Sequence, residues 1–299
     1  MKNNKHAYLI IAHNQFELLI SLLKALDYEQ NDIYLHIDKK VKNISEERFL
    51  REINKSRIFI LKNRVNVKWG DFSQIECELR LLETAIKENY SYYHLLSGVD
   101  MPLKKQEEIH DFFDRNYGTE FIHFDAENLS NDVYMRVSKY HFFIKRQRNI
   151  VGKIINKMIL FFQHPINRMK KYGLTYQKGA NWFSITNDLA HYVVERRKLI
   201  EKAFKHTVCG DEMFLQSIVV SSPFIKNLVS DNFCDNYKNI MYCIDWKRGK
   251  PYEYTLSDYD ELIKSEMLFA RKFNWEKDKE IVLALLKHVQ GEIEIIHDN

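Results

Sequence analysis

The stretch HAYLIIAHNQFELLISLLKALDYEQNDIYLHIDKK, residues 6–40, decides the fold. It opens with a short apolar run at 6–13, continues with apolar residues at helical spacing over 14–27, and closes with an alternating segment at 32–40 that ends in charge. A strand, a helix and a second strand within roughly 30 residues form the βαβ unit, whose two strands pair in parallel. The opening of the chain therefore predicts an α/β protein.

The same alternation continues through the first half of the chain. Strands are expected at 57–63, 92–103 and 120–125, and amphipathic helices at 73–89 and 106–116. Strands that alternate with helices build a parallel sheet covered by helices. We predict an α/β fold with a Rossmann-like, mostly parallel sheet flanked by helices.

The second half is less regular. Residues 179–206 predict a glycine turn, a short strand and one long helix, and residues 230–252 are rich in loop-forming side chains. The chain has 299 residues but only nine glycines and four prolines, which suits one large domain without long linkers. We therefore predict a single domain over residues 1–299 with a loop-rich C-terminal part.

The cysteines and the N-terminus point to the cytoplasm. Cys77, Cys209, Cys234 and Cys243 lack the spacing of zinc or redox motifs, so we interpret them as reduced thiols. His13 interrupts the first apolar run before a signal-peptide core is complete. No run reaches the roughly 18 apolar residues of a spanning helix. We expect neither a secreted nor a membrane-spanning protein.

Polar residues gather where the predicted strands end. In open α/β sheets, ligands bind outside the carboxyl ends of the strands. The chain has no G-x-G-x-x-G after its first strand and no phosphate-binding P-loop motif, which disfavours a dinucleotide enzyme or a P-loop NTPase. The expected ligand-binding residues are His13, Asn14, Asp38, Lys39 and the segments 69–72 and 97–100.

Charge is distributed unevenly. Residues 133–187 contain no Asp or Glu but eleven lysines and arginines, interleaved with aliphatic and aromatic residues. This pattern favours a surface helix on anionic lipid. A groove for a phosphorylated substrate and an ordinary solvated helix face are the alternatives.

The stretch CGDEMFLQSIV, residues 209–219, places two acids between a glycine and an apolar run. Such acids cap the helix that follows. Neighbouring helical residues face different directions, so one of the two, Asp211 or Glu212, is alternatively free to act as a general base in a cleft.

A second local pattern places Arg271 and Lys272 between Phe269 and Phe273. Two cations held between aromatic residues suit the clamping of a diphosphate. The alternative is an ordinary helix C-terminus whose dipole the cations complement.

Several short motifs in fixed order resemble the core-2/I-branching enzymes, glycosyltransferase family 14, whose relatives include peptide xylosyltransferases. The resemblance spans nearly the whole chain, and the motifs are AYLIIAHNQ (7–15), IYLHIDKK (33–40), YYHLLSGVDMPLKK (92–105), GANWFSIT (179–186), CGDEMFLQSIV (209–219), IDWKRGKP (244–251) and FARKF (269–273).

The resemblance implies a GT-A type fold and an inverting transfer from a nucleotide-sugar donor to an acceptor hydroxyl. Glu212 matches the family's acid and is the expected general base, with Asp211 capping the helix or orienting its neighbour. Residues 1–128 would form the nucleotide-sugar-binding half, and residues 129–299 the acceptor-binding and catalytic half.

The resembled family manages without a metal ion and uses basic side chains on the donor diphosphate instead. Lys272 matches the family's lysine and follows Arg271. In an ungapped comparison the family's second cation aligns with Gly249, so its neighbours Arg248 and Lys250 are the two candidates for that role. Asp258-Tyr259-Asp260 forms an Asp-x-Asp string, but it sits at a predicted helix start, where capping explains it. We expect no metal and no other cofactor; a metal-dependent GT-A transferase is the near alternative.

Other matched positions imply further site residues. Asp38 matches a donor-site aspartate that would contact the uridine or ribose, with Ala12, His13 and Trp69 close to the nucleotide. The remaining cleft or acceptor residues are expected to be Gly98, Asp100, Asn181, Trp182 and Asp211.

We expect neither the membrane anchor nor the disulfide-bonded cysteines of the animal enzymes, so the chain resembles a bacterial version. The expected partners are a UDP-sugar and a saccharide acceptor linked to a lipid diphosphate, with peripheral membrane contact through the basic segment 133–187. A nucleic-acid-binding protein that uses this segment is the alternative from a different class. No stretch resembles a known nucleic-acid module, so no nucleic-acid partner is expected.

Overall fold

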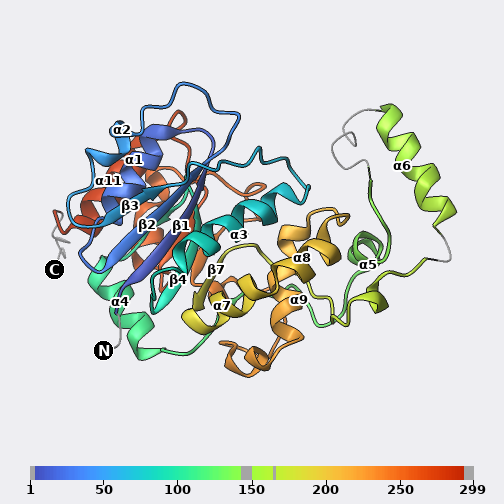
Figure 1. Cartoon of the computed structure of the whole chain (residues 1–299). Coiled ribbons are helices and arrows are strands. Elements are labelled where there is room, and N and C mark those ends of the chain that lie inside the picture. Colours follow the sequence, from blue (N-terminus) through green and yellow to red (C-terminus); the bar gives the residue numbers. More distant parts are fainter. Residues whose placement is uncertain (1–3, 143–149, 164–165, 293–299) are drawn as a thin grey trace.

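The computed structural model describes residues 4–142, 150–163 and 166–292. Its centre is a six-stranded sheet in the order β3-β2-β1-β4-β7-β6, in which β1, β2, β3 and β4 run parallel and β7 runs antiparallel to β4 and β6 (Figure 1). The strands are β1 (His6–Ala12), β2 (Asn31–Ile37), β3 (Arg57–Ile60), β4 (Tyr92–Ser97), β6 (Phe121–Ile122) and β7 (Phe183–Thr186). This arrangement confirms the predicted mostly parallel α/β sheet flanked by helices.

Helices cover both faces of the sheet (Figure 1). Side chains of β1 alternate between two hydrophobic cores: Tyr8 and Ile10 pack with α1, α4 and α11, whereas Ala7 and Leu9 pack with α3, α7, α8 and α9. The helices are α1 (Phe16–Ala25), α2 (Glu47–Leu50), α3 (Ser73–Ala85), α4 (Gln106–Arg115), α5 (Asn131–Ser138), α6 (Ile150–Phe162), α7 (Asn187–Glu195), α8 (Arg197–Phe204), α9 (Phe214–Val220), α10 (Tyr259–Lys264) and α11 (Lys279–Gln290).

A second, three-stranded sheet corrects one prediction for the C-terminal part. Its order is β5-β9-β8, formed by β5 (Met101–Pro102), β9 (Phe269–Arg271) and β8 (Tyr242–Ile244). Arg271 therefore ends a strand, and the alternative of a helix C-terminus is wrong. Phe269 and Ala270 are fully buried between two partner strands, a tertiary pairing that local sequence does not reveal.

The predicted long helix within 179–206 is also corrected. The helix divides at Arg196 into α7 and α8. The strand predicted before the helix is present as β7. The Arg196 backbone N–H bonds back to the last turn of α7, and the residue adopts a non-helical conformation there. The break lets both helices keep their apolar faces on the same core.

The order of the strands creates a place for a ligand. β1 lies between β2 and β4, so the chain leaves β1 toward one side and later returns on the other. At such a switch point the loops after neighbouring strands separate and leave a crevice at the carboxyl ends. The predicted strand-end residues are therefore brought to one edge of the sheet.

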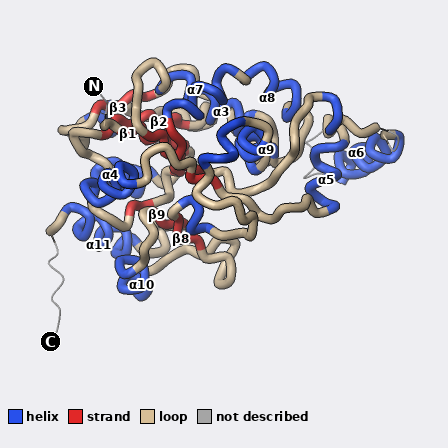
Figure 2. Tube along the Cα trace, turned by 90° about the horizontal axis from the view of Figure 1, so that it is seen from below, coloured by secondary structure: helices blue, strands red, loops and turns tan. Residues whose placement is uncertain are grey.

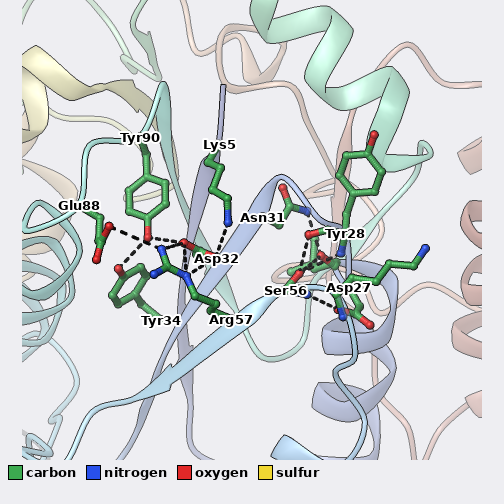
Figure 3. Close-up of polar contacts among 12 residues, drawn as sticks. Lys5, Asp27, Tyr28, Asn31, Asp32, Tyr34, Ser56, Arg57, Glu88 and Tyr90 are labelled. Carbon is green, nitrogen blue, oxygen red and sulfur yellow. Dashed lines mark hydrogen bonds and ion pairs between the residues drawn. The ribbon is translucent and has the colours of Figure 1, made fainter. Parts of the chain in front are cut away.

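The opposite end of β2 is fixed by a buried carboxylate (Figure 3). Asp32 accepts hydrogen bonds from the Arg57 guanidinium and from the Tyr90 hydroxyl at 2.7 Å, and Lys5 Nζ lies 3.3 Å away. Burial alone would raise the pKa of Asp32, but the bonds from Arg57 and Tyr90 hold it below its ordinary value. This network joins β2 to β3 far from the cleft, so we assign it a structural role.

Helix α6 lies at the edge of the molecule beside α5, away from the central sheet, in both Figure 1 and Figure 2. Within the described ranges, no helix is long and apolar enough to cross a membrane.

Candidate active site

A cleft of about 770 Å³ opens at the carboxyl ends of β1, β2 and β4. It is also bordered by the segment before β7 and by the turn at Gly210–Glu212. The predicted site residues that line it come from distant parts of the chain, and they are His13, Asp38, Trp69, Asn181, Trp182, Asp211, Glu212 and Arg271. Most of the predicted site is thus brought together in one place.

The other predicted residues are described but lie outside the cleft lining: Ala12, Gly98, Asp100, Arg248, Lys250 and Lys272. Gly98 supports the site through packing, because a Cβ at this position would come within 2.9 Å of the Ala12 Cβ. The absence of a side chain lets the ends of β1 and β4 approach each other directly beneath the cleft.

Asp38 lies at the end of β2 and lines the cleft. Its buried carboxylate accepts backbone hydrogen bonds from Lys40 at 2.7 Å and from Val67 at 3.2 Å. These bonds tie the end of β2 to the segment that presents Trp69, whose side chain is 68% exposed. An exposed indole beside a cleft is available to stack on a planar or sugar ring.

Arg271 is a fixed cation in the cleft. Its guanidinium carbon lies 4.1 Å from the ring centroid of Trp182, and Nη1 lies 3.4 Å from Asp100 Oδ1. Asp100 is fully buried and also accepts the Ser97 backbone N–H at 2.8 Å. Burial raises the pKa of Asp100, and the neighbouring Arg271 opposes that rise. Asp100 is therefore better described as a support for Arg271 than as a cleft residue.

Lys272 lies beside the cleft. Its Nζ is 3.2 Å from Glu253 Oε1, and its positive charge contributes to the lowered pKa of His13, which burial lowers most. The Lys272 side chain is one-third exposed, so the ammonium group is free to turn toward a ligand that enters near His13.

The structure separates Arg248 from the cleft. Its Nη1 donates to Asp258 Oδ1 at 2.6 Å, its Nε contacts Asp245, and its guanidinium stacks on Tyr252 at 4.2 Å. Lys250 is exposed. Asp258 also accepts the Thr255 backbone N–H at 2.8 Å, which confirms that the Asp-x-Asp string caps a helical turn.

Glu212 faces the cleft between two cations. Its Oε2 lies 3.4 Å from Arg136 Nη1 and 3.8 Å from Lys178 Nζ, and its side chain is 37% exposed. The Glu212 carbonyl accepts the Gly179 N–H at 2.9 Å. A Cβ at residue 179 would overlap the His123 carbonyl oxygen at 1.8 Å, so only glycine permits this close approach. Gly179 thereby fixes Glu212 at the cleft wall.

Asp211 does not cap the following helix, which corrects that expectation. Helix α9 begins after Met213 and receives no side-chain cap, whereas the Asp211 carboxyl is buried and its Oδ1 has no partner among the described residues. The reason is that α3 packs over the turn: a Cβ on Gly210 would meet Ile75 Cδ1 at 3.0 Å. Burial, followed by the negative charge of Glu212, raises the pKa of Asp211 to about 7.

A second buried acid lies behind Asp211. Glu78 on α3 is fully buried, and neither of its carboxyl oxygens has a hydrogen-bond partner in the described part of the chain. Burial and the nearby Asp211 raise the pKa of Glu78 well above its ordinary value. The folded protein therefore holds protons here that the unfolded chain would release.

This proton binding predicts a pH dependence of stability. A raised carboxyl pKa in the folded state stabilises the fold at low pH, and that contribution is lost as pH rises from the ordinary value of 4.5 through the raised pKa of Glu78. Between pH 5 and pH 8, urea titrations should show the wild type losing more unfolding free energy than Glu78→Gln, by an amount on the order of 1 kcal/mol or more. Glu83→Gln, a partly exposed acid on the same helix, is the control. Parallel pH profiles for wild type and Glu78→Gln would contradict the assignment.

One group at the wall of the cleft resembles a metal site, with two acids in the lining and a buried histidine behind them. His123, Asp125 and Asp235 offer ligand atoms that all lie within 4.8 Å of one another. The Ala180 N–H donates to His123 Nδ1 at 3.0 Å, so the proton of the neutral ring sits on Nε2, 3.1 Å from Asp235 Oδ1. A neutral imidazole that binds metal through Nε2 carries its proton on Nδ1, where it would oppose the Ala180 N–H. The geometry thus favours a hydrogen-bonded His123 and leaves only the two aspartates as ligands.

Sequence reasoning missed several polar residues in or beside the cleft. His123 and Asp125 end the predicted strand at 120–125, so the strand-end rule could have found them. Lys178 directly precedes the GANW motif, whereas Asp235 lies in a loop and gave no signal. Arg136 was counted only as part of the basic segment, although it contacts Glu212.

A mostly parallel α/β sheet with a cleft at its switch point, a carboxylate on one wall and a cation on another, is the arrangement in which α/β enzymes carry their active sites. The chain belongs to the Core-2/I-Branching enzyme family, whose model matches residues 6–267. This match confirms the predicted family, which is a family of glycosyltransferases.

The chain is also similar to individual members. It is 22% identical to Xylosyltransferase 2 of Rattus norvegicus over 303 residues, which cover 95% of this chain and 34% of the relative. It is 22% identical to Xylosyltransferase oxt of Drosophila melanogaster over 289 residues, covering 90% and 32%. The chain spans about a third of the length of these curated relatives. The crystal structure of mouse Xyloside xylosyltransferase 1 in its apo form matches with a TM-score of 0.37 and 10% identity, covering 89% of this chain and 97% of that chain.

Proposed function

We propose that the protein is an inverting, metal-independent glycosyltransferase that moves a sugar from a UDP-sugar to a hydroxyl of a saccharide acceptor. The observation that carries the proposal is the position of Glu212, a partly exposed carboxylate that shares one cleft with the fixed cation Arg271. A carboxylate that takes a proton from an acceptor must be accessible to it, and of the two adjacent acids that line the cleft the Glu212 side chain is 37% exposed whereas Asp211 is 8% exposed.

The proposed reaction is a single in-line displacement. Glu212 takes the proton of the acceptor hydroxyl as its oxygen forms a bond to the anomeric carbon of the donor. The bond between that carbon and the diphosphate oxygen breaks, UDP leaves from the opposite face, and the anomeric configuration inverts. Arg271, joined by Lys272 once it turns from Glu253, stabilises the negative charge that develops on the diphosphate.

The two halves of the predicted domain divide the substrates in this proposal. Asp38, His13 and Trp69 of the first half (1–128) hold the nucleotide. Residues of the second half (129–299), including Asn181 and Trp182, receive the acceptor, and that half also supplies the base and the diphosphate cations. The sugar is N-acetylglucosamine, xylose or a similar one. Family membership favours this enzymatic proposal over nucleic-acid binding by the basic segment.

The proposed setting is the synthesis of a bacterial surface polysaccharide in the cytoplasm, at the inner face of the cell membrane. A growing polysaccharide on a lipid diphosphate would bring the acceptor hydroxyl to an enzyme held there by basic residues. Lys145, Arg146 and Arg148 of the basic segment lie outside the described residues. Lys170 and Lys171 are described and exposed.

A metal-dependent transferase is the second candidate, because Asp125 and Asp235 line the same cleft and could supply oxygen ligands. Turnover of a panel of UDP-sugars with saccharide acceptors, followed as UDP release, separates the two candidates. The metal-independent proposal expects the same rate in EDTA as in manganese, and product NMR should show an inverted anomeric centre. Activity lost in EDTA, restored by manganese and abolished by Asp235→Asn would favour the second candidate.

A further inference from the structure

Helix α6 exposes an apolar face to solvent. Ile154 and Met158 are each 54% exposed, and Phe161 and Phe162 are 78% and 79% exposed. These positions are spaced by four, three and one residues, so they fall on one side of the helix. A surface helix of a globular protein normally turns such a stripe toward its core, and an exposed stripe marks an interaction surface.

The charge of the segment around α6 indicates which partner its apolar face would bind. The helix belongs to the segment 133–187, which contains no Asp or Glu, and the exposed Lys170 and Lys171 follow it closely. An apolar helical face followed in the chain by exposed cations fits a bilayer that carries anionic headgroups. The 13 residues of α6 are too few to span a bilayer, for which about 20 are needed, so the helix would lie in the interface.

We infer that α6 is an interfacial anchor whose Ile154, Met158, Phe161 and Phe162 enter the acyl boundary of an anionic bilayer, with Lys170 and Lys171 on the headgroups. The inference rests on the proposed function and deepens it, because it specifies how the enzyme reaches a lipid-linked acceptor.

Buried polar contacts connect the anchor to the cleft. Lys139, which follows α5, donates to the carbonyl of Gln163 at 2.9 Å and thereby holds the end of α6. Arg168 donates to Thr207 Oγ1 at 2.6 Å, close in sequence to the turn that carries Glu212. Arg136 on α5 itself lies 3.4 Å from Glu212. Insertion of α6 would therefore set the position of Glu212 relative to the membrane surface.

The test is sedimentation of the full chain with vesicles of phosphatidylcholine alone and of phosphatidylcholine mixed with phosphatidylglycerol. The wild type should bind only the mixed vesicles. The double variant Phe161→Ser/Phe162→Ser should bind them at least tenfold more weakly at every salt concentration, because the apolar contribution is removed. Lys170→Gln/Lys171→Gln should weaken binding mainly at low salt. Leu256→Ser, an exposed apolar residue on the other part of the molecule, is the matched control.

Other results would overturn the inference. Unchanged vesicle binding by the double phenylalanine variant would exclude apolar insertion. Absence of vesicle binding, together with a wild-type dimer that the same variant converts to monomer, would assign the face to a second copy of the chain. UDP-sugar binding and turnover on a soluble acceptor, measured for every variant, report folding and the proposed function separately. Vesicle binding without turnover would support α6 as a membrane anchor and contradict the proposed glycosyltransferase activity.

Discussion

Replacement of Glu212 by Gln is expected to lower kcat by about 10²–10⁴-fold while the Kd for the UDP-sugar stays within a few-fold of wild type. The amide keeps the shape of the side chain but cannot accept the proton of the acceptor hydroxyl. The cation Arg136, 3.4 Å away, would still find Asp132 at 2.6 Å, so local structure should persist. Steady-state turnover and calorimetric binding of the donor measure the two quantities.

Asp132→Asn is the matched control for this substitution. It removes the other carboxylate that contacts Arg136, but its side chain is 71% exposed and takes no part in the proposed chemistry. It should leave kcat within about two- or threefold of wild type, since exposed ion pairs contribute little. Equal loss of activity in both variants would mean that the charge balance around Arg136 matters and that Glu212 is not the base.

Replacement of Lys272 by Met is expected to weaken binding of UDP and of the UDP-sugar by roughly 10–100-fold, because charge-assisted hydrogen bonds to a diphosphate contribute about 1.5–3 kcal/mol. Binding of uridine, which carries no phosphate, should change little. Titration of all three ligands in EDTA measures this difference. An equal loss for uridine would show that Lys272 supports the fold or the base pocket instead of the diphosphate.

Arg248→Gln tests one of the two residues, Arg248 and Lys250, that the sequence offered as the partner of Lys272 on the diphosphate. The structure ties Arg248 to Asp245 and Asp258 outside the cleft lining. We therefore expect diphosphate binding in Arg248→Gln to remain within a few-fold of wild type. A loss as large as that of Lys272→Met would show that the segment around Arg248 moves onto the donor when the donor binds.

The sheet and the ligand edge could be predicted because they depend on local pattern. In residues 6–40 the apolar residues recur at helical spacing in one part and alternate in another, so the helix and the strands could be told apart. Asp38 directly follows the second predicted strand. The position of a strand end fixes its place at the carboxyl edge of a parallel sheet, so the cleft followed from the order of the elements.

The parts that local sequence did not predict depend on tertiary contacts. The local sequence predicts that Asp211 caps a helix, but α3 packs over this turn and the Asp211 carboxyl is buried near Glu78. The local sequence allows Arg271 to end a helix, but pairing with β5 and β8 makes its segment the strand β9. His123 and Asp235 are more than a hundred residues apart and meet only in the folded chain.

Calorimetric titration of a UDP-sugar panel in EDTA, against wild type and Glu212→Gln, tests the central claim most directly. The account predicts selective binding of one UDP-sugar without metal, with similar Kd values for both proteins and turnover only by the wild type. Absence of binding to every UDP-sugar in EDTA, or binding that appears only with added manganese, would contradict it.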